Sequence, residues 1–344
     1  MNMQPSFFDQ DRVLSKLDKL NDPLLKIDEI VNWEGFRLTL EEIRPQYDKQ
    51  KGGRPPLDVV LMFKMIFLRH YYDLSLKQAE YQVLDRLSFR RFLGLQLEDP
   101  VPDTNTVWVY EERLVDSKLI KPLFEDLMLQ IENAGYLPRG GQIIDATIVE
   151  APVRKKRDDD DNDNGPSGSV LTPAQKRQRN KDAHWTKKHG KSYFGYKDHI
   201  NVDNKHKLIR CWEVTPANRH DGHLLNDLLD ARNSSADVYA DSAYRSVENE
   251  QKLLDREFRS QINRTKPRHK PMPKHIERGN LRKSTVRARV EHVCGGIKQG
   301  AAKQFIKSIG LPRATLRVGL KNMAYNIKRF KHLLRHVTPM HRTA

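Results

Sequence analysis

The chain has 344 residues, 38% of them hydrophobic and 31% charged, and a formal net charge of +16. This composition predicts a soluble globular protein with two domains, or one large domain with an appendage, and excludes a disordered chain. No apolar run is long enough to span a membrane, the first residues lack a signal-peptide pattern, and the two cysteines form no metal or disulfide motif, so we expect a cytoplasmic protein.

Residues 1–140 are predicted to form a helical N-terminal domain. Apolar residues are dense in LDVVLMFKMIFLRHYY, and LSLKQAEYQVLDRL follows with Ser75 as its expected N-cap. A third helix is expected in TNTVWVYEERL, capped by Thr104 or Thr106. Three short helices with tight turns fit a helix-turn-helix DNA-binding domain, and an ordinary helical bundle fits the pattern about equally well.

Strand patterns begin after Gly141. GQIIDATIVEAP is rich in β-branched residues and predicts a strand, and SYFGYKDHINVD with HKLIRCWEVTP predicts a hairpin that turns near Asp203. Between them, residues 154–191 are charged and rich in Gly, Ser and Pro, which predicts a flexible insertion. HDGHLLNDLLDA is expected to be a helix, DVYA a strand, SVENEQKLLDREF a helix capped by Ser246, and RSQIN a short strand. This order predicts a mixed α/β sheet with flanking helices over residues 141–336.

Residues 262–336 predict a basic helical region, which a tail at 337–344 follows. From residue 262 onward there are 21 Lys and Arg residues but two acidic ones, whereas the preceding residues carry 40 basic and 43 acidic side chains. A basic surface of this length fits a polyanion such as DNA or RNA, and a solvated basic face is the structural alternative. The last helix carries an apolar stripe of Leu316, Leu320, Met323, Ile327, Phe330 and Leu334.

Three carboxylates stand out against this background. Asp145 lies in the middle of a strand whose same face should be buried, where a charge is costly unless it is paired or bound to a cation. Asp241 follows a short strand, at the position where α/β sheets place ligand groups, and Glu291 lies in the basic region. Each has an ordinary explanation: a bonded buried Asp, a turn Asp, and an i,i+4 ion pair between Glu291 and Arg287. Taken together, they form an oxygen-ligand site suited to Mg²⁺.

Glu291 is predicted to share a helix face with Ser284, Arg287 and Lys298. A separate apolar stripe, which would pack on the sheet, is formed by Val286, Val290, Val293 and Ile297. Arg287 and Lys298 would therefore lie next to the carboxylates, where cations hold a DNA phosphate backbone.

Other candidate sites are weaker. The DDDDNDN run matches the first half of an EF-hand loop, but Leu171 stands where a bidentate Glu is required. The histidines do not repeat a zinc spacing with cysteines. His220 and Asp221, in TPANRHDG after a strand, are candidates for an accessory role at the site, although a helix-start role for Asp221 explains the pair more simply.

Several segments in this order resemble bacterial insertion-sequence transposases of the DDE class, most closely the insertion-sequence-five-like group: IIDATIVEAP, YFGYKDHINVD, TPANRHD, ADSAYRS and RARVEHVCGGIK. The resemblance runs from about Gly52 to Phe330. It implies a ribonuclease-H-like catalytic core. The residues of its acidic triad map onto Asp145, Asp241 and Glu291. A Tyr, Arg, Glu, Lys pattern of related transposases is matched by Arg287, Glu291 and Lys298, with Ser284 at the Tyr position.

The resemblance also implies an activity and its partners. Two Mg²⁺ ions held by the triad, with Mn²⁺ as a substitute, would support cleavage at the ends of the element and strand transfer of the freed 3′-hydroxyl into target DNA. The partners would be double-stranded DNA, namely terminal inverted repeats and target, with a homodimer on paired ends and a nucleoid-associated location in the cytoplasm. The alternatives are a domesticated, inactive DNA-binding protein and a ribonuclease-H-like nuclease without strand transfer.

Overall fold

The computed structural model describes residues 9–46, 50, 55–153, 179–188, 190–267, 269–298 and 306–336. The chain forms two compact units, one combining residues 1–137 with 319–344 and the other spanning 138–318. The predicted domain boundaries at residues 140 and 336 remain predictions, and the predicted tail at 337–344 lies outside the described residues. None of the described helices is both long and apolar enough to cross a membrane.

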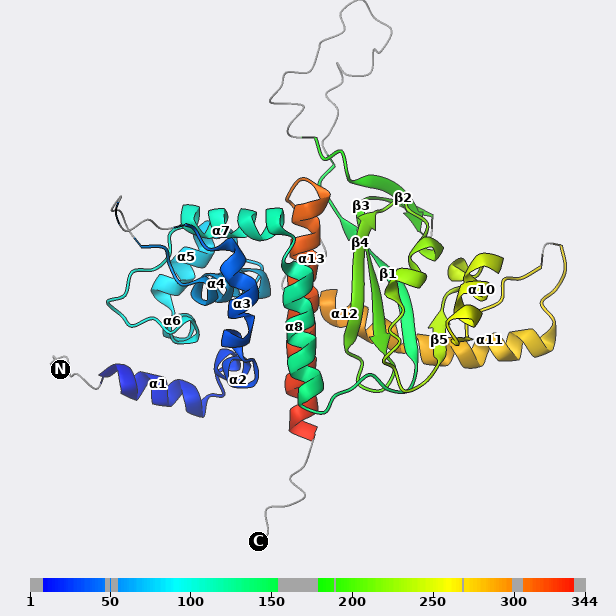
Figure 1. The fold of residues 1–344 in the computed structure, drawn as a ribbon, viewed down its shortest axis with the longest axis horizontal. Helices are drawn as coiled ribbons and strands as arrows, with labels where there is room; N and C mark the ends of the chain where they lie inside the picture. The colour runs from blue at the N-terminus through cyan, green and yellow to red at the C-terminus, as the bar shows by residue number, and fades with distance from the viewer. Residues whose placement is uncertain are drawn as a thin grey trace, which may run out of the picture. The chain divides into compact units, whose positions relative to one another are not determined.

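The first unit is helical, as predicted (Figure 1). Its helices are α1 (Asp9–Lys19), α2 (Pro23–Ile30), α3 (Arg37–Leu40), α4 (Val59–Tyr71), α5 (Leu76–Asp85), α6 (Leu87–Leu93), α7 (Thr104–Ser117) and α8 (Ile120–Asn133). Ser75 caps α5 in a reciprocal capping box with Gln78, as predicted. The cap predicted for α7 is wrong: Asp103 accepts the Thr106 amide hydrogen at 2.8 Å, and Thr104 is already the first helical residue.

The second unit is built on a six-stranded mixed sheet (Figure 1). Its strands are β1 (Gln142–Glu150), β2 (His184–Lys188), β3 (Lys191–Asp203), β4 (Ile209–Pro216), β5 (Asp237–Ala240) and β6 (Arg259–Ser260). β3 pairs antiparallel with β1, β2 and β4, whereas β5 and β6 continue the sheet parallel to β1. This confirms the mixed α/β class, the hairpin after Asp203 and the short strand in RSQIN. The sheet also corrects one expectation, because β2 lies inside the stretch predicted to be a flexible insertion.

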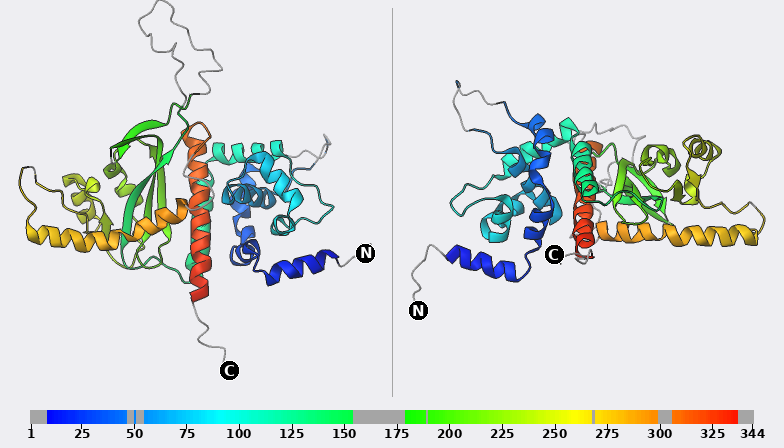
Figure 2. Two further views of the ribbon diagram at one scale, coloured as in Figure 1. Left: turned by 180° about the vertical axis from the view of Figure 1, so that it is seen from behind. Right: turned by 60° about the horizontal axis from the view of Figure 1, so that its bottom comes forward.

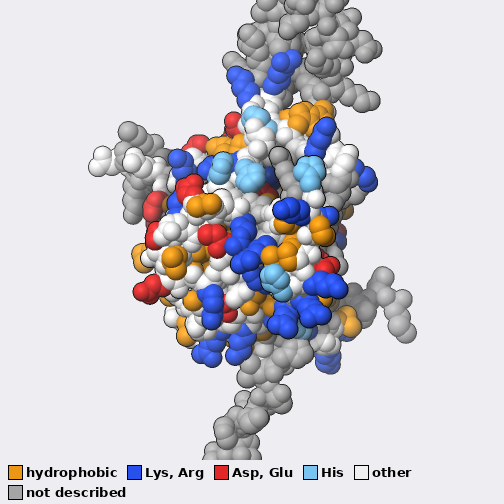
Figure 3. Space-filling model, turned by 90° about the vertical axis from the view of Figure 1, so that its right-hand side faces the viewer, with side chains coloured by type: hydrophobic (Ala, Val, Ile, Leu, Met, Phe, Trp, Pro, Cys, Tyr) orange, Lys and Arg blue, Asp and Glu red, His pale blue; other side chains and the backbone are white. Residues whose placement is uncertain are grey.

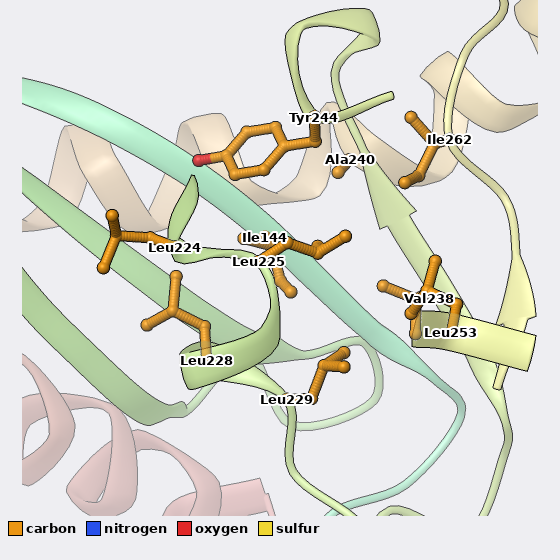
Figure 4. Close-up of a cluster of buried hydrophobic side chains, with 10 residues drawn as sticks. All are labelled: Ile144, Leu224, Leu225, Leu228, Leu229, Val238, Ala240, Tyr244, Leu253 and Ile262. Carbon is orange, nitrogen blue, oxygen red and sulfur yellow. The ribbon is translucent and has the colours of Figure 1, made fainter. Parts of the chain in front are cut away.

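One face of the sheet is covered by an apolar cluster rather than by the helix expected from HDGHLLNDLLDA. That segment forms two short 3₁₀ turns, η5 (Asp221–Leu224) and η6 (Asn226–Leu228). Its four leucines still pack together with Ile144 of β1 and Tyr244 (Figure 4). The cluster members are Ile144, Leu224, Leu225, Leu228, Leu229, Val238, Ala240, Tyr244, Leu253 and Ile262. Helix α10 (Val247–Asp255) follows, capped by Ser246 as predicted.

The opposite face of the sheet is covered by α11 (Lys274–Arg287) and α12 (Arg289–Lys298). The two helices run behind the sheet in Figure 1 and in front of it in the reversed view of Figure 2. Helix α12 packs on β1, and three members of the predicted apolar stripe, Val290, Val293 and Ile297, are buried. The fourth, Val286, is half-buried and lies in α11, because the single helix predicted to carry Ser284 to Lys298 is divided at Ala288. The last helix, α13 (Leu311–His336), has residues in both units, and its predicted stripe is buried except for Leu334, which is 38% exposed.

Candidate active site

The register of β1 and β5 brings two of the predicted carboxylates side by side. The strands are parallel, with Ile143 opposite Tyr239 and Ile144 opposite Ala240. The next residues are Asp145, within β1, and Asp241, which directly follows the end of β5. Since Ile144 and Ala240 both belong to the apolar cluster on one face, alternation places the two carboxylates together on the other face, which α11 and α12 cover.

Asp145 is partly buried, and the guanidinium group of Arg287 lies at the outer limit of ion-pair distance from it. Its side chain is 21% exposed, and an Arg287 Nη1 atom lies 3.8 Å from its Oδ2 atom. Burial raises the pKa of Asp145, the Arg287 guanidinium opposes the rise, and the Asp241 carboxylate adds to it. The Nε atom of Arg287 is buried and has no hydrogen-bond partner among the described residues. This carboxylate is therefore in a setting where a further cation would stabilise its charged form.

Asp241 is exposed and already has one of its oxygens engaged. Its Oδ1 atom accepts hydrogen bonds from the Ser242 backbone amide and, at 3.1 Å, from the Ser242 hydroxyl group, so it caps the 3₁₀ turn η7 (Ser242–Tyr244). The turn explanation for this residue is thus correct. It does not compete with a ligand role, because the second oxygen, Oδ2, takes no part in the cap.

Glu291 lies in the first turn of α12 and is exposed. Arg287 lies four residues before Glu291, and Cys294 lies three residues after it. The Asp145 carboxylate lies 3.8 Å from the Arg287 guanidinium. Burial raises the pKa of the Cys294 thiol to about 12, and the Asp145 carboxylate adds to that rise. The junction between α11 and α12, three residues before Glu291, therefore lies next to Asp145. The ordinary alternative, an Arg287–Glu291 ion pair, is absent among the described residues.

The three carboxylates are not drawn together into a preformed metal cluster. Within the part of the chain that the structure describes, no group of three or more His, Cys, Asp or Glu side chains is close enough to hold a metal ion. The pair Asp145 and Asp241 nevertheless offers the hard oxygen donors that Mg²⁺ prefers. These two residues fit a divalent cation, and Glu291 would complete the set by a movement of its exposed side chain.

Ser284 has a structural partner that the sequence pattern did not reveal. Its hydroxyl oxygen accepts a 3.0 Å hydrogen bond from Asn263 Nδ2. The backbone amide of Asn263 in turn donates to the Ala240 carbonyl at 3.4 Å, immediately before Asp241. The bond therefore connects α11 to the strand end that carries Asp241. No local signal in RSQIN marks Asn263, because the contact depends on packing between distant segments.

Lys298 and Lys188 place positive charge around the same site. Lys298 is exposed, and its ammonium group opposes the rise in the pKa of Cys294. Lys188 of β2 lowers the pKa of Asp145, after the larger effects of burial and Arg287. Lys298 belongs to the predicted set of site residues, whereas Lys188 was missed because it lies in the stretch predicted to be flexible.

His220 and Asp221 are not joined to the carboxylate pair. His220 caps η5 by accepting the Gly222 amide hydrogen at 3.2 Å, and Asp221 accepts a 2.7 Å bond from Lys197. No hydrogen bond or ion pair connects His220 with Asp145 or Asp241 in the described ranges. Tyr244 is fully buried and is affected by both groups of residues. Burial raises its pKa, and the carboxylates of Asp221, Asp145 and Asp241 add to the rise. An accessory role for His220 and Asp221 remains a prediction.

His199 is expected to make the second unit sensitive to acid. It is 0% exposed, its Nε2 atom lies 2.8 Å from Thr215 Oγ1, and burial lowers its pKa from 6.5 to about 4 against the opposing effect of Asp221. Between those values the unfolded chain binds a proton that the folded chain does not, so stability falls as the pH drops below 6.5. We expect a loss of about 2 kcal/mol between pH 7 and pH 5 in urea unfolding. His199→Gln should reduce this loss, and an equal pH dependence in both proteins would contradict the assignment.

Two family models match the chain. One described as "Transposase domain (DUF772)" matches residues 12–113, and one described as "Transposase DDE domain" matches residues 137–327. Among solved structures, the chain is similar to a piggyBac transposase in a synaptic complex with hairpin DNA, with a TM-score of 0.45 and 11% identity over 89% of this chain and 72% of that chain.

Proposed function

The chain belongs to the family of proteins with a transposase DDE domain, and from that premise we propose which of its residues carry out DNA cleavage and strand transfer. The protein is a DNA transposase, an enzyme of a family that uses divalent metal ions. The proposal assigns its catalytic carboxylates to Asp145, Asp241 and Glu291. The observation that carries it is the adjacency of Asp145 and Asp241 on neighbouring parallel strands, on the face covered by the helix of Glu291.

Each proposed residue has a defined task. Asp145 and Asp241 hold the cation from neighbouring strand positions, and Glu291 approaches from α12. These carboxylates would hold two Mg²⁺ ions, which would supply Lewis-acid activation for phosphoryl transfer. Arg287, whose buried Nε atom has no hydrogen-bond partner within the described residues, would bind a non-bridging phosphate oxygen when a cation neutralises Asp145. Lys298 binds a neighbouring phosphate.

The DNA partners follow from the family and from charge. Lys and Arg side chains gather across the middle and lower part of the face on the α10–α11 side (Figure 3). We propose that this surface and the helices of residues 1–140 bind double-stranded DNA, namely the inverted repeats at the ends of an insertion-sequence-five-like element and the target. A homodimer on paired ends and a location at the nucleoid in the cytoplasm belong to the same proposal.

The activity is tested with the full chain and DNA fragments that carry the inverted repeats flanking its gene. We expect cleavage that exposes a 3′-hydroxyl at the element end, and joining of pre-cut ends to a target plasmid, in Mg²⁺ or Mn²⁺ but not in EDTA. Cleavage without joined product would favour the nuclease alternative. Binding without cleavage in either metal would favour an inactive DNA-binding copy.

A further inference from the structure

The strand β2 and the first residues of β3 form an arm next to the catalytic carboxylates. We define the β2–β3 arm as residues 184–188 and 191–194, which pair antiparallel from Trp185 opposite Phe194 to Lys188 opposite Lys191. From Gly195 onward, β3 pairs antiparallel with β1, the strand that contains Asp145. The arm is therefore part of the same sheet as the proposed active site.

Gly195 is the point at which the arm begins, because it pairs with both Glu150 of β1 and His184 of β2. Its φ angle is +154°, and a Cβ atom at this position would lie 2.1 Å from the Val149 carbonyl oxygen of β1. Only glycine allows β3 to pass this close to β1 while changing its backbone direction. Beyond this point β2 and β3 form the arm, which ends with Lys188 opposite Lys191.

The base of the arm is held firmly. Asn180 accepts hydrogen bonds from the Tyr196 hydroxyl at 2.7 Å and from the Gly310 amide at 3.3 Å, and Asp182 accepts the Leu311 amide hydrogen at 2.7 Å. Ala183 is buried. A strand that is anchored at its base but has largely exposed side chains is suited to present those side chains to a partner.

The exposed side chains of the arm combine lysines with an aromatic ring. Lys187, Lys188 and Lys191 are exposed, and the segment from 184 to 194 contains no acidic residue. Lys188 lies directly opposite Lys191, an arrangement of like charges that destabilises an isolated sheet. A bound anion removes that repulsion. Trp185 is 55% exposed and rests on Phe194, with ring centroids 5.3 Å apart.

We propose that the β2–β3 arm binds the DNA strand that enters the active site, with Lys187 and Lys188 on its phosphates and Trp185 stacked on an unpaired base at the cleaved end. The inference rests on the proposed function, since it deepens the same site. Aromatic faces beside lysines form the usual platform for single-stranded nucleic acid, because every base offers a π-face. Cleavage leaves a strand end at which a base can leave its pair, and stacking on Trp185 would offset the cost of that unpairing.

The test measures binding in EDTA, so that it does not depend on cleavage. The probe is a pre-cut inverted-repeat end with 2-aminopurine in its terminal unpaired nucleotides. Trp185→Ala is expected to weaken binding about 5- to 100-fold and to abolish the quenching of 2-aminopurine, whereas Trp185→Phe retains most of both. Lys187→Ala and Lys188→Ala should each reduce the slope of log affinity against log salt by about 1, without abolishing quenching by Trp185.

The control variant removes another exposed apolar side chain, from α10. Leu254→Ala, at a residue that is 69% exposed, should match the wild type in affinity, quenching and salt slope. Wild-type affinity and quenching in Trp185→Ala, or unchanged salt slopes in both lysine variants, would overturn the proposal. If the wild type binds and quenches but does not cut in Mg²⁺ or Mn²⁺, the proposed function fails while the arm remains a DNA-binding element.

Discussion

Asp145→Asn and Asp241→Asn are each expected to reduce metal-dependent DNA cleavage by about 1,000-fold or more, with binding to the inverted repeats retained. Each substitution removes one negative charge from a pair of carboxylates on adjacent strand positions, and a metal ion contributes several kcal/mol of stabilisation to a phosphoryl-transfer transition state. An Asn at position 241 keeps an oxygen that can accept the Ser242 amide hydrogen, so the cap of η7 and the fold are preserved.

The assay compares initial cleavage rates at saturating DNA with affinities measured by gel shift. Glu291→Gln belongs in the same series, since Glu291 is the residue whose placement depends most on movement. Asp255→Asn is a matched control, because it changes an exposed carboxylate at the end of α10 that bonds only Gln251 among the described residues. Cleavage within tenfold of the wild type in Asp145→Asn or Asp241→Asn would show that another site cuts the DNA.

Much of the second unit could be predicted because its signals are local. The β-branched residues in GQIIDATIVEAP, the turn at Asp203 and the serine caps are each local signals that depend on a few neighbouring residues. The segment HDGHLLNDLLDA has a true helical spacing of leucines, and all four are buried as that spacing predicts. It nevertheless forms 3₁₀ turns, with the Leu225 amide bonded to Gly222 and the Leu228 amide bonded to Leu225, because packing on the sheet decides the backbone path.

The sequence selects candidate residues for the site, but it does not give their contacts. Strand spacing and the family resemblance both select Asp145 and Asp241, yet the sequence alone favoured an ion pair within the helix for Arg287. In the structure Arg287 is the last residue of α11 and its Nη1 atom lies 3.8 Å from Asp145, because the predicted single helix is divided there into α11 and α12, and α12 packs on β1. The position of α12 on β1 depends on how buried side chains such as Val290 and Val293 pack against the strand. That packing cannot be predicted from the local pattern of one sequence.

Asp203→Ala is expected to lower the free energy of unfolding by about 3–5 kcal/mol. Asp203 and Arg210 form an ion pair at 3.1 Å with 0% and 1% of their side chains exposed. The same carboxylate accepts the amide hydrogens of His206 at 2.7 Å and Leu208 at 3.1 Å, so it also closes the β3–β4 hairpin. Its removal leaves the buried charge of Arg210 without the carboxylate that neutralises it, which costs more than the pair contributes.

The measurement is urea unfolding at pH 7 followed by far-UV circular dichroism. The double variant Asp203→Ala with Arg210→Met should recover part of the loss, because it removes the buried charge as well as its partner. Lys252→Ala serves as the surface control, since its ion pair with Glu248 is exposed on both sides and should leave the midpoint unchanged. A loss below about 1 kcal/mol in Asp203→Ala would mean that the hairpin rearranges to bring water to Arg210. Because β3 pairs directly with the strand of Asp145, such a rearrangement should also change cleavage, which the same variants can report.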